Sequence, residues 1–218
     1  MKIFLATKNK GKIKDFEKLT EGMNIEVLSI LDDIEIPDVV EDGTTFEENS
    51  QKKALEISRF IKITTISDDS GLCVDALNGE PGIFSARYAG EDGNDKKNNE
   101  KLLQNLKDVP KEKRTAHFIS VVSIAFPDGK VESFSGRADG EILFENCGDG
   151  GFGYDPLFYS YDLKKSFGVA SPEEKKSVSH RGRAFRKLIE SKILESKNNV
   201  SKFENKYLKH KKKFGKNL

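Results

Sequence analysis

Residues 3–19, IFLATKNKGKIKDFEKL, place a strand, a basic turn and a helix in direct succession at the start of the chain. Apolar side chains fill the strand segment from Ile3 to Ala6. Further on, Ile13, Phe16 and Leu19 recur at the spacing of one helix face. A strand that enters a helix through a short turn is the building unit of α/β proteins. We therefore predict an α/β fold that begins with this unit.

The turn inside this unit, Thr7–Lys12 (TKNKGK), has the composition of a phosphate-binding turn. A helix start presents backbone N–H groups and the positive end of the helix dipole, and lysines add positive charge. The turn matches neither the Walker A pattern nor the Gly-rich dinucleotide fingerprint. An ordinary strand-to-helix turn with solvated lysines explains the segment equally well.

The overall composition excludes several classes of protein. The chain has 218 residues, with 37 Lys and Arg against 36 Asp and Glu, so its net charge of +1 gives no electrostatic case for nucleic-acid binding. The length suits one domain or a two-lobed one, and the lysines are concentrated after Lys197, where the chain becomes rich in Lys and Asn.

Two cysteines, Cys73 and Cys147, are too few for a disulfide scaffold, and their spacing does not fit a zinc site. No apolar run approaches the length of a membrane span, and the first strand begins too early for a signal peptide. We therefore expect a soluble cytoplasmic protein in a reducing compartment, with no membrane partner.

The rest of the chain predicts a mixed sheet. Thr44 and Thr45 each precede a glutamate by three residues, which predicts two overlapping capping boxes and a helix to about Ile61. Strands are expected at 25–29, 64–67, 72–74, 115–126 and 131–134, and helices at 13–19, 95–106 and after Pro172. The turn Pro127–Lys130 (PDGK) joins the two long β-prone runs as a hairpin, so antiparallel strands must join the parallel ones.

Two acidic segments are candidates for metal chemistry. Asp68–Gly71 (DDSG) follows a β-prone run, and carboxylates at a strand end suit Mg²⁺, which prefers oxygen ligands together with waters and substrate phosphates. A plain turn is the alternative, because Asp and Gly are turn residues. Glu41-Asp42 is a second source of carboxylates, and a solvated loop is its simpler interpretation.

Two later segments are candidates for recognition of a base. Gly151–Pro156 (GFGYDP) sets two aromatic rings beside an aspartate, which suits stacking and hydrogen bonding; buried hairpin rings are the alternative. His180 and Arg181 stand at a predicted helix start with Lys175 upstream. Cations there oppose the helix dipole, which indicates ligand binding, although a single histidine is more often structural.

Taken together, these segments resemble the inosine/xanthosine triphosphate pyrophosphatases, the Ham1-like noncanonical purine NTP pyrophosphatases. The matching segments are Ala6–Lys12, Glu41–Gly43 with Thr45–Asn49, Asp68–Leu72, Pro81–Tyr88, Gly150–Pro156, and Glu173–Lys175 with Ser179–Arg181. They occur in the family's order from residue 3 to about 190, and the chain beyond about Leu194 runs past the resemblance.

The resemblance implies an elongated α/β protein with a mixed central sheet and two lobes that flank a nucleotide cleft. This two-lobed domain is expected over residues 1–194, followed by a Lys/Asn-rich extension over 195–218. It implies a homodimer that uses Mg²⁺ to hydrolyse ITP, dITP and XTP to the monophosphate and pyrophosphate, which cleanses the nucleotide pool.

The resemblance also implies roles for individual residues. The triphosphate is expected at Thr7, Lys8, Asn9, Lys10, Gly11, Lys12 and Lys53; Mg²⁺ at Glu41 and Asp69, with Asp69 also the general base; the nucleotide at Ser70; and the base at Phe152, Gly153, Tyr154, Asp155, Lys175, His180 and Arg181.

Two other functions stay open from the sequence. One is a pyrophosphatase for a modified or pyrimidine nucleotide, which would share the phosphate chemistry and differ in the base pocket. The other, from a different class, is a nucleic-acid-binding protein that acts through the lysine-rich extension, although the near-neutral remainder argues against a nucleic-acid partner.

Overall fold

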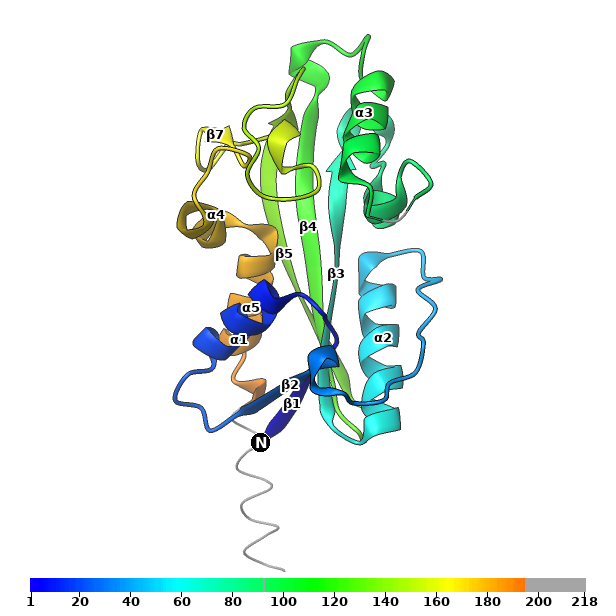
Figure 1. Cartoon of the computed structure of the whole chain (residues 1–218), viewed down its shortest axis with the longest axis vertical. Coiled ribbons are helices and arrows are strands. Elements are labelled where there is room, and N and C mark those ends of the chain that lie inside the picture. Colours follow the sequence, from blue (N-terminus) through cyan, green and yellow to red (C-terminus); the bar gives the residue numbers. More distant parts are fainter. Residues whose placement is uncertain (92, 195–218) are drawn as a thin grey trace, which may run out of the picture.

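The computed structural model describes residues 1–91 and 93–194 (Figure 1). The expected extension at 195–218 lies outside the described residues. Within them, no helix is both long enough and apolar enough to cross a membrane. Cys73 and Cys147 are both free cysteines.

A seven-stranded mixed sheet organises the described chain, with strand order β2-β1-β3-β4-β5-β6-β7. The strands are β1 (Lys2–Leu5), β2 (Glu26–Ser29), β3 (Thr64–Val74), β4 (Thr115–Ala125), β5 (Val131–Ile142), β6 (Phe158–Ser160) and β7 (Lys165–Ser166). Strand β1 is parallel to β2 and β3, and every pair from β3 to β7 is antiparallel. The predicted mixed sheet is confirmed.

Helices cover both faces of this sheet. The α-helices are α1 (Lys10–Leu19), α2 (Phe46–Ile61), α3 (Asp95–Asn105), α4 (Pro172–Val178) and α5 (His180–Glu190). Short 3₁₀ helices are η1 (Ile30–Asp32), η2 (Asp75–Leu77), η3 (Gly82–Arg87), η4 (Lys111–Lys113) and η5 (Asp155–Leu157). In Figure 1, α2 lies on one side of the long strands and α1 and α5 on the other, while α3 lies toward the opposite end of the molecule.

Helix α2 begins where the sequence indicates, with one capping box in place of the two expected. The Thr45 hydroxyl accepts a hydrogen bond from the Glu48 backbone N–H, and the Glu48 carboxylate accepts from the backbone of Thr45. Thr44 donates its backbone N–H and its hydroxyl to the same carboxylate. One glutamate therefore serves both threonines.

Strand β3 is longer than expected. The sequence predicted that Asp68–Gly71 would end a strand, but β3 continues through them to Val74. Asp68 pairs with Val122, and Asp69 pairs with Val121, on β4. The long antiparallel partner supplies backbone hydrogen bonds along the whole segment, which outweighs the turn preference of Asp and Gly. The expectations of a strand end and of a plain turn were both wrong.

Two other boundaries differ. Strand β5 extends to Ile142, well beyond the predicted Phe134, because it stays paired with β4 along its length. The helix expected after Pro172 is two helices, because Ser179 is both the C-cap of α4 and the N-cap of α5. Its extended backbone ends the first helix, and its side chain caps the start of the second.

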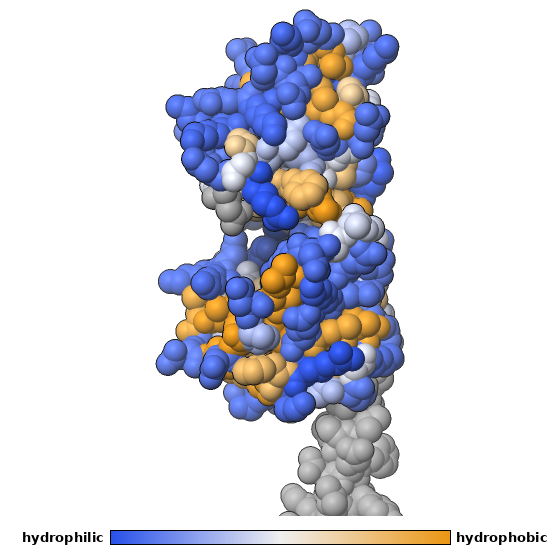
Figure 2. Space-filling model, turned by 90° about the vertical axis from the view of Figure 1, so that its right-hand side faces the viewer, coloured by the Kyte–Doolittle hydropathy of each residue, from blue (hydrophilic) through white to orange (hydrophobic). Residues whose placement is uncertain are grey.

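Polar residues on one face of β3 separate two hydrophobic clusters. Ile66 packs with Phe185 in the cluster under α1 and α5, whereas Leu72 packs with Phe158 in the cluster at the other end of the long strands. Asp68 and Ser70 stand between them on the same face, because side chains alternate along a strand. We call these ends the α5 lobe and the α3 lobe. The surface is hollowed between the lobes (Figure 2).

Candidate active site

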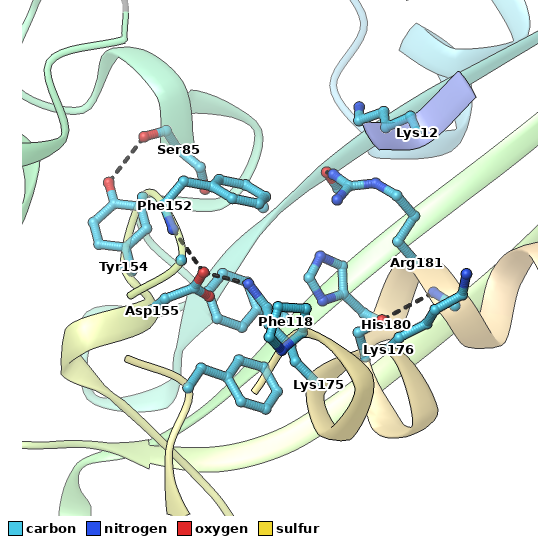
Figure 3. A pocket seen from close by; sticks show the side chains of 18 of the residues that line it. Lys12, Ser85, Phe118, Phe152, Tyr154, Asp155, Lys175, Lys176, His180 and Arg181 are labelled. Atoms are coloured by element: carbon cyan, nitrogen blue, oxygen red, sulfur yellow. Dashed lines mark hydrogen bonds and ion pairs between the residues drawn. The ribbon is translucent and has the colours of Figure 1, made fainter. Parts of the chain in front are cut away.

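A cavity of about 510 Å³ lies at this junction between the lobes. Residues that line it include Ser70, Phe118, Phe152, Asp155, Lys175 and Arg181. In the close view, Lys12 and Arg181 lie on one side of the cavity and Phe152, Tyr154 and Asp155 on the other, with His180 between them (Figure 3). The cavity therefore brings together segments from both halves of the sequence.

Asp68 forms a buried ion-pair network. Its two carboxylate oxygens accept hydrogen bonds from Lys12 Nζ, both at 2.8 Å, and Oδ2 also accepts from Arg181 Nε at 3.1 Å. Burial alone would raise the pKa of Asp68, but the charges of Lys12 and Arg181 outweigh burial and hold it well below its ordinary value. Asp68 is therefore a carboxylate already engaged by two cations.

Asp69 points to the other face of the sheet, toward α2. Its Oδ2 accepts a hydrogen bond from Asn49 Nδ2 at 3.2 Å. Burial, together with the negative charges of Glu41 and Asp68, raises the pKa of Asp69 to about 6. A carboxyl group that titrates near neutral pH is suited to general-base chemistry.

Asn49 is a residue that sequence reasoning missed as part of the site. Its side-chain oxygen accepts from the Gly43 backbone N–H at 2.8 Å, while its nitrogen donates to Asp69. It therefore ties the loop that carries Glu41 to the strand that carries Asp69. The available signal was its place in the first turn of a capped helix, where a polar side chain can reach neighbouring backbone.

Glu41 and Asp69 have the donor chemistry that Mg²⁺ requires. Both supply carboxylate oxygens, and Mg²⁺ is usually held by one or two carboxylates together with waters and substrate phosphates. The charge of Glu41 contributes to the raised pKa of Asp69, and a bound cation would relieve this repulsion. Among residues 1–91 and 93–194, no group of three or more His, Cys, Asp or Glu is placed to hold a metal ion. The two carboxylates nevertheless fit a magnesium ion shared with a phosphate ligand.

Lys53 stands beside this pair. Its Nζ donates to Glu41 Oε1 at 2.6 Å. Burial lowers the pKa of Lys12, and the positive charges of Arg181 and Lys53 add to that effect. Lys12 and Lys53 therefore belong to one electrostatic cluster, although they come from different helices.

The basic turn is arranged differently from the expected anion site. Asn9 is the N-cap of α1, and its side-chain oxygen accepts from the backbone N–H groups of Gly11 and Lys12 at 2.9 and 3.2 Å. The Thr7 hydroxyl accepts from the Asn9 N–H at 3.1 Å. These N–H groups, which we expected to face a ligand, are occupied because asparagine is a strong N-cap. Lys8 and Lys10 are exposed beside them.

The loop Gly151–Pro156, with its two aromatic residues, forms the wall of the cavity that faces Lys12 and Arg181. Asp155 Oδ2 accepts from the Phe152 N–H at 2.8 Å and forms a short ion pair with Lys175. The Lys175 ammonium lies 4.6 Å from the centroid of the Phe152 ring. Phe152 is 56% exposed, whereas Tyr154 is buried. The alternative of two buried hairpin rings therefore holds for Tyr154 and fails for Phe152.

Hydrogen bonds from helices α3 and η3 hold this loop in place. Gly153 donates its N–H to Asp95 at 2.6 Å, and its carbonyl accepts from the Asn99 side chain at 3.0 Å. The Tyr154 hydroxyl donates to the Ser85 carbonyl at 2.9 Å. Asp95 and Asn99 carry no signal in the sequence alone, because the contacts join distant segments. Ser85 lies in the matching segment Pro81–Tyr88, but no role was assigned to it.

His180 is the first residue of α5 and is buried against Phe118. The two rings stack with centroids 4.9 Å apart, and His180 is 6% exposed. Burial, with the charges of Arg181 and Lys175, lowers the pKa of His180 well below its ordinary value. The imidazole is therefore neutral, and of the two cations expected at this helix start only Arg181 opposes the helix dipole. Within the described chain, His180 Nδ1 is buried without a hydrogen-bond partner.

Arg181 completes the network on the α5 side, since its Nη2 donates to Ser70 Oγ at 3.1 Å. The structure thus groups the expected residues into three sets. Lys12 and Arg181 meet at Asp68, and Arg181 also contacts Ser70. Glu41, Lys53 and Asp69 meet near α2. Phe152–Asp155 and Lys175 form the far wall, and His180 lies between the two sides of the cavity (Figure 3).

Fold and site together define a two-lobed α/β protein whose cleft offers cations and carboxylates at one end and an aromatic, hydrogen-bonding pocket at the other. The chain belongs to the Ham1 family, whose model matches residues 3–191.

Relatives and solved structures agree with this assignment. The chain is 48% identical to a dITP/XTP pyrophosphatase of Bacillus cereus over 195 residues, which cover 88% of this chain and 95% of that one. It is 45% identical to a dITP/XTP pyrophosphatase of Listeria monocytogenes, over 92% of this chain and 98% of that one. Among solved structures it is similar to the Ham1 protein of Staphylococcus aureus, with 42% identity, a TM-score of 0.78, and coverage of 86% and 96%.

Proposed function

We propose that this chain hydrolyses noncanonical purine nucleoside triphosphates, namely dITP, ITP and XTP, to the monophosphate and pyrophosphate. The relatives named as dITP/XTP pyrophosphatases support this proposal across nearly their full lengths. The observation that carries it is the position of Asp69. This carboxyl group has a pKa raised to about 6, lies on β3 between the two lobes, and stands near Glu41, whose carboxylate accepts a hydrogen bond from Lys53.

The phosphate end would neutralise a triphosphate. Lys12 and Lys53, with the Thr7–Lys12 turn, would bind its oxygens, and Glu41 and Asp69 would hold Mg²⁺. When bound, the magnesium ion would neutralise charge that develops on the phosphates.

Asp69 would act on the attacking water. It accepts a proton as the water oxygen bonds to the α-phosphorus, and the bond from that phosphorus to the oxygen bridging to the β-phosphate breaks. Pyrophosphate leaves with the electron pair of that bond. A base with a pKa near 6 is ionised at neutral pH and still able to take the proton.

Residues on both sides of the cavity would select the base. Phe152 would stack on the purine, and Arg181 with His180 would offer donors to a 6-keto oxygen. Adenine presents a 6-amino donor at this point, so ATP would leave buried donors without acceptors. Tyr154, Asp155 and Lys175 would shape the remaining edge of the pocket, with Gly153 in the loop that carries them.

A pyrophosphate-release panel over ITP, XTP, dITP, GTP, ATP and dUTP tests the function, with Asp69→Asn as the inactive control. We expect rapid release from the first three nucleotides in Mg²⁺. Preference for dUTP or a modified pyrimidine would favour the other pyrophosphatase, and release from none of the panel would overturn the proposal.

We further propose that the enzyme is a homodimer and that it acts in the cytoplasm. Dimer formation is expected from the family resemblance and is measured by light scattering on the purified chain. A monomer with full activity would contradict it.

A further inference from the structure

Asp68 is the point where the two ends of the cleft meet. Its side chain is 7% exposed in the middle of β3, between the two hydrophobic clusters. One cation reaches it from the first turns of α1, and the other from the first turn of α5. Both carboxylate oxygens accept from Lys12 at 2.8 Å, and Oδ2 also accepts from Arg181 at 3.1 Å.

The contacts continue beyond Asp68 in a connected chain. Arg181 Nη2 donates to Ser70 at 3.1 Å, and the guanidinium lies 5.9 Å from the ring centroid of Phe152. Lys12 belongs to the phosphate end of the proposed site, whereas the guanidinium of Arg181 lies near Phe152 of the base pocket. One carboxylate therefore holds the two cations that would bind opposite ends of the nucleotide.

The charges favour coupling between these cations. Two cations share one carboxylate, which leaves one net positive charge for an incoming phosphate. When a phosphate attracts Lys12, Asp68 is left with Arg181 as its remaining charged partner. A buried carboxylate holds its remaining partner more firmly when the other is drawn away, because an unpaired buried charge is costly.

We propose that Asp68 is a positioning residue that couples phosphate binding at Lys12 to base recognition at Arg181. The inference rests on the proposed function. It assigns no proton transfer to Asp68, which lies on the opposite face of β3 from Asp69 and has both oxygens occupied. When a phosphate binds at Lys12, the guanidinium of Arg181 is held in place by Asp68, and in this position it hydrogen-bonds the base.

The test is a double-mutant cycle. We would measure kcat/KM for ITP and ATP in the wild-type protein, in Lys12→Ala, in Arg181→Ala and in the double variant. The same four measurements would then be repeated in an Asp68→Asn background. For ITP, we expect the double variant to lose about tenfold less than the product of the single losses, equivalent to about 1.4 kcal/mol of coupling. In the Asp68→Asn background the losses should multiply.

Two further measurements separate positioning from a structural role. Asp68→Asn should lower the ITP-to-ATP ratio of kcat/KM. Loss of stability alone would instead lower kcat/KM for ITP and for ATP by the same factor. Asp68→Glu, which keeps the carboxylate, should restore part of the ratio. Melting temperatures of all variants show whether each one folds.

Three outcomes would overturn the inference. The first is a multiplicative cycle in the wild-type background, which can be read even if Asp68→Asn fails to fold. The second is coupling of equal size in Asp68→Asn, which would assign it to direct repulsion between Lys12 and Arg181. The third is an unchanged ITP-to-ATP ratio in a folded Asp68→Asn protein. Failure of the wild-type protein to hydrolyse ITP would instead overturn the proposed function, and it is seen before any variant is made.

Discussion

At the scale of single residues, two adjacent aspartates have opposite electrostatic environments. Alternation along β3 directs Asp68 toward Lys12 and Arg181, and Asp69 toward Asn49 and α2. The pKa of the first is lowered by its cations, and that of the second is raised to about 6, mainly by burial. The residue types alone could not separate their roles, because both aspartates were placed at a strand end. Only the family resemblance assigned the metal and base roles to Asp69.

Asp69→Asn is expected to abolish turnover without unfolding the protein. It removes the candidate base together with one carboxylate of the proposed magnesium site, and loss of general-base help alone costs about 10²- to 10⁴-fold in rate. The measurement is ITP hydrolysis in Mg²⁺, with circular dichroism to confirm the fold. Asp68→Asn is the matched control and should retain more activity. The opposite order would exchange the two roles.

Arg181→Ala is expected to lower the ratio of kcat/KM for ITP to kcat/KM for ATP, because the value for ITP falls. Loss of its donors should lower kcat/KM for ITP and XTP by about 1–3 kcal/mol and leave the slow reaction with ATP nearly unchanged. Initial rates on the three nucleotides measure this. Arg183→Ala, on the same helix but paired with Asp162, is the control. A parallel fall for ITP and ATP would make Arg181 a phosphate-binding or structural residue.

His180 predicts a pH dependence of stability. Its pKa in the folded protein is well below the ordinary value of 6.5, so the unfolded chain binds the proton more readily. Its contribution to stability is therefore fully present above about pH 6.5 and is lost as pH falls below that value. Melting temperatures near pH 5 and pH 8 test this.

His180→Gln isolates this effect, because His117 also has a pKa lowered by burial and Asp69 changes stability in the opposite sense. The drop in melting temperature between about pH 8 and pH 5 should be smaller in the variant than in the wild-type protein. An equal drop in both proteins would show that His180 is not buried as a neutral group.

At the scale of elements, local patterns located most helices, and long-range pairing set the strand lengths. The helix ending at Ile61 was predicted from its caps and periodicity alone. The continuation of β3 through Asp68–Gly71 could not be predicted, since it depends on a partner strand some fifty residues away. For the same reason Asn49, Phe118 and Asn99 were missed as parts of the site.

Helix α5 depends on such a long-range contact at Gly136. A Cβ atom at this position of β5 would lie 2.0 Å from the His180 carbonyl oxygen and 2.5 Å from the Ala184 nitrogen. Only glycine allows the first turn of α5, with His180 and Arg181, to approach the sheet this closely.

Gly136→Ala should therefore displace that turn. We expect a loss of stability of about 1–3 kcal/mol from overpacking, and a fall in kcat/KM that is larger for ITP than for ATP. Chemical denaturation and initial rates measure the two effects. Ser135→Ala, at the exposed neighbouring position, is the control and should change neither. A wild-type melting curve for Gly136→Ala would contradict the close approach.

At the scale of the whole molecule, the polar interruption of a long strand positions the site. Ile66 and Leu72 belong to different hydrophobic clusters, and Ser70 and Gly71, which lie between them on β3, line the cavity at the junction. The sequence predicted the mixed α/β sheet, and the family resemblance supplied its two lobes. Neither showed that Asp68 and Ser70 mark the boundary between the clusters, because this becomes visible only when β3 is continuous.

The extension after residue 194 is expected to be dispensable for catalysis. The family match ends at residue 191, and deletion of residues 197–218 keeps every member that the described residues supply to the cluster of the α5 lobe, including Ile193 and Leu194. We expect the truncated protein to keep its kcat/KM for ITP and its melting temperature. A fall in melting temperature, or loss of the expected dimer, would assign a packing role to Phe203, Tyr207 or Phe214.

Binding of a DNA duplex at two salt concentrations, with and without the extension, tests the nucleic-acid alternative, since phosphate contacts weaken steeply with salt. Salt-sensitive binding by the full chain alone, with ITP hydrolysis unchanged, would give the extension a second role separate from the cleft.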